Sequence, residues 1–242
     1  MNRLPAVTKN LLVINAIMFL ASFVAKEKGF DLDFFLGLHS PVSDNFYPYQ
    51  FVTYMFMHGS LTHLFFNMFA LYMFGQALEF VWGPKRFLVY YMVAGIGAGL
   101  VHEAISYYRF CEVAAGIAPQ DVEIVVREGG ALLRQGMNYA YPPLGELNAI
   151  ANSLTVGASG AIYAILLGFG MLFPNERMFI IPIPFPIKAM YVVLGYIVIE
   201  LYLGVAGTND GVAHFAHLGG ALFGLFLILY WRKSKKIGGP YV

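Results

Sequence analysis

The chain has 242 residues, of which 59% are apolar and only 12% are charged, with a formal net charge of +1. Soluble domains carry roughly 25% charged residues, so this composition predicts a membrane protein. The near-neutral charge gives no basic surface for nucleic acid, and the single cysteine, Cys111, excludes an intramolecular disulfide. We expect one membrane domain over residues 1–242, with no soluble domain attached.

Six apolar segments approach the roughly 20 residues that a helix needs to cross the hydrocarbon core. They are residues 10–25, 51–80, 87–108, 159–173, 187–205 and 212–231. The first has a basic flank, and a cleaved signal peptide is its alternative. Because no small-x-small cleavage pattern precedes Lys26, we expect it to be a span. The sequence therefore predicts an all-α membrane protein, a bundle of six transmembrane helices.

Two connections between the spans are long. Residues 26–50 are rich in aromatic side chains, which favours a position in the membrane interface. The second is an external insertion over 106–154. Within it, the apolar spacing of 121–134 suggests an amphipathic helix broken at the Gly129-Gly130 pair, and a surface strand over 122–126 fits equally well.

The distribution of Lys and Arg orients the chain. If both termini and the second and fourth connections share one side, that side holds ten of the fifteen Lys and Arg. These ten are Arg3, Lys9, Lys85, Arg86, Arg177, Lys188, Arg232, Lys233, Lys235 and Lys236. Positive residues favour the cytoplasmic side, so we predict a multi-pass protein of the bacterial inner membrane with both termini in the cytoplasm.

Polar side chains at bilayer depth are costly, so each is a functional candidate. Ser159 lies in Gly157-Ala158-Ser159-Gly160, at the start of the fourth span. Small neighbours leave its hydroxyl uncovered and let another helix approach closely, and a serine nucleophile needs both. The alternative is a helix-packing face made of small residues.

His217 lies one turn before Gly220, and Gly220 and Gly224 form a G-x-x-x-G face in the sixth span. If the partner of this face is the fourth span, His217 would meet Ser159. A neutral imidazole could then take the hydroxyl proton and return it to the leaving amine. The alternative is a histidine that only bonds to a neighbouring helix.

His63 and Asn67 are four residues apart in the second span and share one helix face. Both can donate hydrogen bonds, which suits a developing oxyanion. His58 lies about 140° around an ideal helix from His63, so we expect it to brace the external loop instead. Structural helix–helix hydrogen bonding is the alternative for all three.

His63, His214 and His217 could also converge on a metal. An intramembrane zinc protease would use His-Glu-x-x-His, and the only His-Glu pair, His102-Glu103, lacks the second histidine. We therefore expect no metal and no cofactor. A channel or transporter with a histidine proton relay is a further reading, but we expect no acidic relay partners within the spans, and no internal repeat is visible.

Together these residues resemble the rhomboid family of intramembrane serine proteases, over roughly residues 10–232. The similarity lies in Tyr49 to His58 followed by His63-x-x-x-Asn67, in Gly157-Ala158-Ser159-Gly160 with Tyr163, and in Ala216-His217-Leu-Gly-Gly220-x-x-x-Gly224. The chain departs from many members in its long 106–154 connection and in lacking a Trp-Arg pair in its first external loop.

The resemblance implies that Ser159 and His217 form a dyad in a water-accessible cavity below the external membrane surface. His63, Asn67 and the Ser159 amide would line the oxyanion hole, and Tyr163 would pack against His217. The substrates would be single-span transmembrane proteins. A non-catalytic membrane chaperone or retrotranslocation factor on the same scaffold is the alternative, although inactive relatives lose the serine or the histidine and this chain keeps both.

Overall fold

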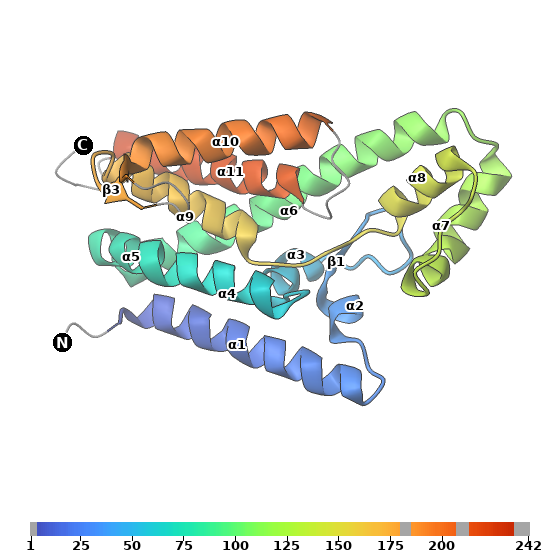
Figure 1. The fold of residues 1–242 in the computed structure, drawn as a ribbon, viewed down its shortest axis with the longest axis horizontal. Helices are drawn as coiled ribbons and strands as arrows, with labels where there is room; N and C mark the ends of the chain where they lie inside the picture. The colour runs from blue at the N-terminus through green and yellow to red at the C-terminus, as the bar shows by residue number, and fades with distance from the viewer. Residues whose placement is uncertain (1–3, 180–184, 207–212, 235–242) are drawn as a thin grey trace.

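The structure is a computed structural model that describes residues 4–179, 185–206 and 213–234 (Figure 1). Its elements in chain order are α1 (Ala6–Glu27), α2 (Leu32–Leu36), β1 (Leu38–His39), α3 (Gln50–Thr53), the 3₁₀ turn η1 (Tyr54–Phe56), α4 (Leu61–Ala70), the π turn η2 (Leu71–Gly75), α5 (Gln76–Trp82), α6 (Pro84–Ala114), α7 (Pro119–Arg134), α8 (Pro142–Ala151), β2 (Leu154–Thr155), α9 (Ser159–Leu172), β3 (Arg177–Met178), β4 (Ile187–Lys188), α10 (Ala189–Ala206) and α11 (His214–Lys233).

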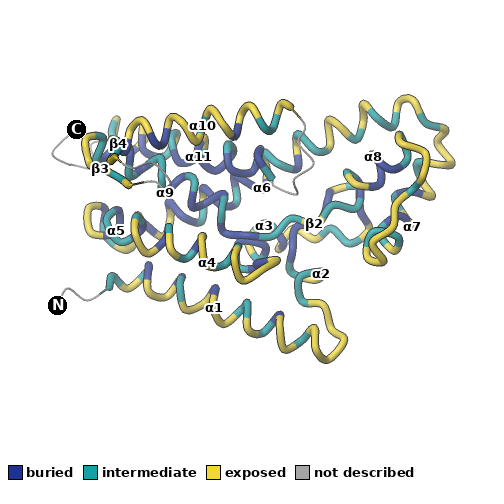
Figure 2. Tube along the Cα trace, viewed as in Figure 1, coloured by how far each residue is buried: buried dark blue, intermediate teal, exposed yellow. Residues whose placement is uncertain are grey.

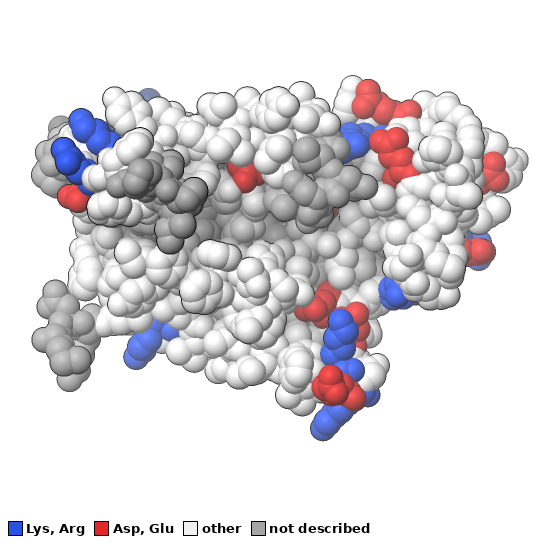
Figure 3. Space-filling view, viewed as in Figure 1, with Lys and Arg blue, Asp and Glu red and all other residues white. Residues whose placement is uncertain are grey.

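The described residues contain five helices long and apolar enough to cross a bilayer, namely α1, the run from α4 to α5, α6, α10 and α11. On the face shown in Figure 3, charged side chains gather toward the two ends and leave a nearly uncharged belt between them. The predicted all-α membrane fold is confirmed, and the chain is an integral membrane protein. The fourth predicted span, 159–173, is the shorter helix α9.

The predicted start of the second span at residue 51 is wrong. The spanning helix begins at Leu61, and residues 50–56 form the separate short turns α3 and η1. Ser60 sets this start as the N-cap, because its Oγ accepts a hydrogen bond from the His63 amide at 3.1 Å. Hydropathy alone extended the span backward because the preceding segment is also apolar.

The insertion over 106–154 also differs from the prediction. α6 continues to Ala114, and its 31 residues make about 46 Å of helix, longer than the roughly 30 Å hydrocarbon core. α7 then runs unbroken through Gly129, so both the predicted break and the alternative strand are wrong. A Cβ on Gly129 would lie 2.0 Å from Asn148 Oδ1, so this glycine lets α8 pack against α7 rather than breaking the helix.

The centre of the bundle is formed by α6, α9 and α11, which pack against one another. The Tyr90 hydroxyl of α6 donates to the Ala164 carbonyl of α9 at 2.6 Å. A Cβ on Gly97 of α6 would lie 2.2 Å from the Phe223 ring of α11. Figure 2 shows buried residues gathered where these three helices meet, whereas α1 and α10 expose much of their surface at the edges of the bundle. The exposed apolar faces of the edge helices are what a lipid environment requires.

Two sets of hydrogen bonds attach the outer elements to the rest of the chain. Glu79 of α5 accepts hydrogen bonds from the amides of Val7 and Thr8 at 2.9 and 2.7 Å, so it satisfies the free amides at the start of α1. On the opposite end, β1 pairs antiparallel with β2, with Leu38 opposite Thr155. This pairing joins the segment that follows α2 to the chain that leads into Ser159.

Candidate active site

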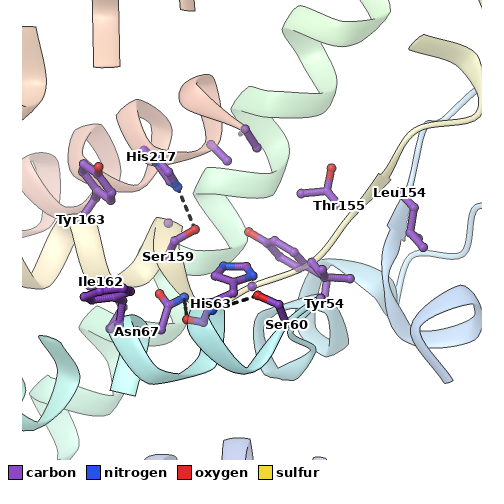
Figure 4. A pocket seen from close by; sticks show the side chains of 17 residues that line it. Tyr54, Ser60, His63, Asn67, Leu154, Thr155, Ser159, Ile162, Tyr163 and His217 are labelled. Atoms are coloured by element: carbon purple, nitrogen blue, oxygen red, sulfur yellow. Dashed lines mark hydrogen bonds between the residues drawn. The ribbon is translucent and has the colours of Figure 1, made fainter. Parts of the chain in front are cut away.

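A cavity of about 580 Å³ lies between α4, α9, α11 and the chain that follows β2 (Figure 4). The residues that line it include most of the side chains singled out in the sequence, namely His63, Asn67, Gly157, Ser159, Gly160, Tyr163 and His217. Tyr54, Ser60 and Thr155 add further polar atoms to its wall. The fold therefore brings polar residues from three distant segments to one cavity.

Ser159 is the first residue of α9 and is half-buried in the cavity wall. Gly157 leads into it with a φ of +131°, and a Cβ there would lie 2.7 Å from the His63 ring. Only glycine fits this conformation and this contact. Because the helix begins at Ser159, its first amides have no intrahelical acceptor and are available to a bound anion.

His217 is buried on α11, and its Nε2 lies 2.8 Å from Ser159 Oγ, within hydrogen-bond distance (Figure 4). The Tyr163 ring stacks on the imidazole, with the ring centroids 4.2 Å apart and the planes 9° from parallel. Stacking leaves both ring nitrogens of His217 free to bond in the plane of the ring.

The close approach of α9 and α11 depends on glycines. A Cβ on Gly220 would lie 1.9 Å from the Gly160 carbonyl oxygen, and a Cβ on Gly224 would lie 2.8 Å from Ala164 Cβ. Gly160 is equally restricted, because a Cβ there would lie 2.4 Å from Ala98 Cβ of α6. These contacts hold His217 at hydrogen-bond distance from Ser159.

His63 and Asn67 lie on one face of α4 and border the cavity beside Ser159 (Figure 4). The Asn67 Nδ2 donates to the His63 carbonyl oxygen at 2.9 Å, which leaves its second N–H for another acceptor. His58 lies outside the helix and is buried, with its ring 5.0 Å from that of His63. It packs against His63 and is not part of the cavity wall.

Sequence reasoning missed Glu200, and the expectation of no acidic side chains within the spans is wrong. Glu79, Glu103 and Glu200 are all buried in α5, α6 and α10. Glu200 lies beside the candidate site, where its carboxylate contacts both His214 and His217. The available signal was one acid inside the otherwise uncharged 18-residue helix α10.

Glu200, His214 and His217 are also the described residues that could hold a metal ion, since one donor atom from each lies within 4.8 Å of the others. His63 does not belong to this group, so the convergence considered for His63, His214 and His217 does not form. The carboxylate already accepts a hydrogen bond from His214 Nδ1 at 2.7 Å and another from the Tyr163 hydroxyl.

The fold and the site define a helical integral membrane protein with a serine and a histidine hydrogen-bonded at the wall of a cavity inside the bundle. The family model described as the rhomboid domain matches residues 45–119 and 125–234. The chain belongs to the rhomboid family, as the motifs predicted.

Similar proteins come from several membranes. The chain is 26% identical over 187 residues to the rhomboid protease AarA of Providencia stuartii, covering 76% of this chain and 56% of the relative. It is 28% identical to a mitochondrial presenilin-associated rhomboid-like protein of Bos taurus, covering 75% and 39%. It is also 28% identical to the chloroplastic rhomboid-like protein 11 of Arabidopsis thaliana, covering 77% and 53%. The matches thus span about half or less of each relative's length.

Proposed function

We propose that the protein is an intramembrane serine endopeptidase, with Ser159 as nucleophile and His217 as general base. The observation that supports this most directly is the 2.8 Å contact between His217 Nε2 and Ser159 Oγ at the wall of the cavity. A serine is a weak nucleophile until a neighbouring base can take its proton, and this contact supplies that base.

The chemistry follows from the geometry. Ser159 Oγ attacks a peptide carbonyl as its proton passes to His217 Nε2, and the imidazolium then protonates the leaving amine. The negative charge on the carbonyl oxygen develops near the free amides at the start of α9, with His63 and Asn67 on the facing helix as further donors. No cofactor or metal is needed for these steps.

We propose single-span transmembrane proteins as substrates, cleaved near the external face. α9 has 14 residues and is about 21 Å long, too short to cross the core, so at least one of its ends lies inside the core, and we place the Ser159 end there. The cavity is therefore close to a substrate helix in the bilayer and is lined by enough polar atoms to admit the water that hydrolysis consumes. The bacterial inner membrane stays a prediction, since the matched relatives come from a bacterium, mitochondria and a chloroplast.

The test is cleavage of a single-span reporter by purified protein in detergent, with and without Ser159→Ala. We expect cleavage by the wild type and none by the variant, and no effect of EDTA on the wild type. Cleavage that survives in purified Ser159→Ala would refute the mechanism. A folded wild type that neither cleaves reporters nor reacts with fluorophosphonates would favour the non-catalytic chaperone instead.

A further inference from the structure

Glu200 is a buried carboxylate in the membrane-spanning helix α10, only 6% exposed. An ionised side chain at this depth is costly unless donors surround it. The Tyr163 hydroxyl of α9 donates to Oε1, and His214 Nδ1 of α11 bonds to Oε2 at 2.7 Å. The protein therefore has a specific arrangement that holds this carboxylate in one orientation.

The held carboxylate faces the second nitrogen of the candidate base. His217 Nδ1 lies 3.1 Å from Glu200 Oε2, while Nε2 of the same ring lies 2.8 Å from Ser159 Oγ. This contact does not meet hydrogen-bond geometry, so it is a close contact that becomes an ion pair when His217 is protonated. The contacts thus connect Ser159 through His217 to Glu200, and each of these residues lies on a different helix.

The position of Glu200 beside Nδ1 determines which tautomer of His217 is favoured. To accept the serine proton at Nε2, the neutral imidazole must carry its hydrogen on Nδ1, the atom that faces Glu200. A carboxylate there stabilises that tautomer and also the imidazolium formed during attack. Among the described residues, the other histidines near His217 are His63, His102 and His214, and a histidine cannot neutralise an imidazolium.

We propose that Glu200 is a positioning residue that completes a Ser159–His217–Glu200 triad, with Tyr163 and His214 holding its carboxylate. The inference rests on the proposed function and extends it. It also gives Tyr163 two roles, since its ring stacks on His217 and its hydroxyl anchors Glu200. The site would then carry out acyl transfer with three residues, a serine, a histidine and a carboxylate, rather than with a serine–histidine dyad.

The primary test is Glu200→Gln, which keeps the shape and removes the charge. The amide group that replaces the carboxylate can donate to Nδ1 and favour the tautomer whose Nε2 carries hydrogen, so that Nε2 no longer accepts the serine proton. The corresponding change in a Ser-His-Asp triad lowers kcat about 10⁴-fold, and we expect a loss of about 10²–10⁴-fold here, in kcat rather than KM. Glu103→Gln is the matched control, because Glu103 is also a buried acid within a span.

A measurement on the wild type keeps the proposal testable if Glu200→Gln does not fold. We expect an imidazole Nδ1–H resonance that reports the tautomer of His217, detected by its correlation to the ring nitrogen in the NMR spectrum and assigned by its loss in His217→Ala. It should persist in Glu103→Gln and vanish in Glu200→Gln. A wild type that cleaves its reporter without this resonance would overturn the triad.

The remaining outcomes separate this inference from the proposed function. If the wild type reacts with a fluorophosphonate and Glu200→Gln reacts at the same rate, the triad is wrong while the Ser159–His217 pair stands. If EDTA inactivates the wild type and Zn²⁺ restores it, Glu200, His214 and His217 are metal ligands and the triad is overturned. Absence of any activity or labelling in the folded wild type would reject the proposed function itself.

Discussion

Ser159 is flanked by Gly157 and Gly160 and is half-buried at the cavity wall, so its hydroxyl contributes little to packing. We predict that Ser159→Ala abolishes reporter cleavage and fluorophosphonate labelling while the thermal unfolding temperature stays nearly unchanged. Removing one oxygen beside an open cavity leaves no new void in the core. The check is cleavage and labelling measured alongside a melting curve. A large fall in melting temperature would instead assign Ser159 a structural role.

Asn67 is buried, and one of its amide hydrogens is already bonded to the His63 carbonyl. We predict that Asn67→Ala slows cleavage by about 10²–10³-fold, the usual cost of losing one oxyanion donor. The loss should be in kcat and smaller than that of Ser159→Ala, because the Ser159 amide and His63 remain. Full activity in a stable variant would remove Asn67 from the site. Inactivity with a collapsed melting temperature would indicate that it only braces α4.

The site residues differ in how far the sequence alone could place them. Ser159 and His217 could be paired because their glycine-rich neighbours mark two helix faces that can meet. Glu200 could not be joined to them, because nothing in the local pattern of α10 says that it packs beside α11. Its third contact, from the Tyr163 hydroxyl, also requires the three-dimensional arrangement of α9 and α10.

At the scale of the helices, the α9–α11 contact has no room for an added methyl group. We predict that Gly220→Ala forces the helices apart, since the new Cβ would lie 1.9 Å from a backbone oxygen that cannot move away alone. Such overpacking typically costs about 1–3 kcal/mol. It should also lengthen the Ser159–His217 distance, so activity should fall more than stability.

Gly195→Ala is the matched control for this prediction. Gly195 is exposed on α10, and a Cβ there would meet nothing within 4 Å. Its activity and melting temperature should equal or exceed those of the wild type, because alanine favours helix more than glycine does. Equal effects of both substitutions would mean that the α9–α11 contact does not depend on Gly220.

Some features of the helices could likewise be predicted from the local sequence, whereas others depend on individual contacts that only the structure shows. α10 and α11 begin within two residues of the predicted limits, because long uncharged runs determine them. The start of α4 depends on the capping hydroxyl of Ser60. Because the segment before Ser60 is also apolar, hydropathy did not reveal this helix start. α7 stays continuous across Gly129 and Gly130 and packs against α8, where Asn152, the C-cap of α8, donates to the Val125 carbonyl at 3.0 Å, a contact that no local glycine rule contains.

At the scale of the whole molecule, the start of α1 and the end of α11 lie at one end of the bundle, and α7 and α8 lie at the other (Figure 1). This arrangement agrees with an orientation in which the Lys- and Arg-rich side holds both ends of the chain. The start of α6, with exposed Lys85, then faces the cytoplasm, and exposed Gln135 after α7 faces outward.

We therefore predict that a cysteine at Gln135 reacts with a membrane-impermeant thiol reagent in intact cells. The background must be Cys111→Ser, because Cys111 is exposed near the external end of α6. Lys85→Cys in the same background should react only after lysis, since it lies in the first turn of α6, at the opposite end of the bundle. The paired readout separates topology from expression, because both residues are exposed. Labelling of Lys85→Cys but not Gln135→Cys in intact cells would invert the orientation, and the cavity beside Ser159 would then open toward the cytoplasmic half of the membrane.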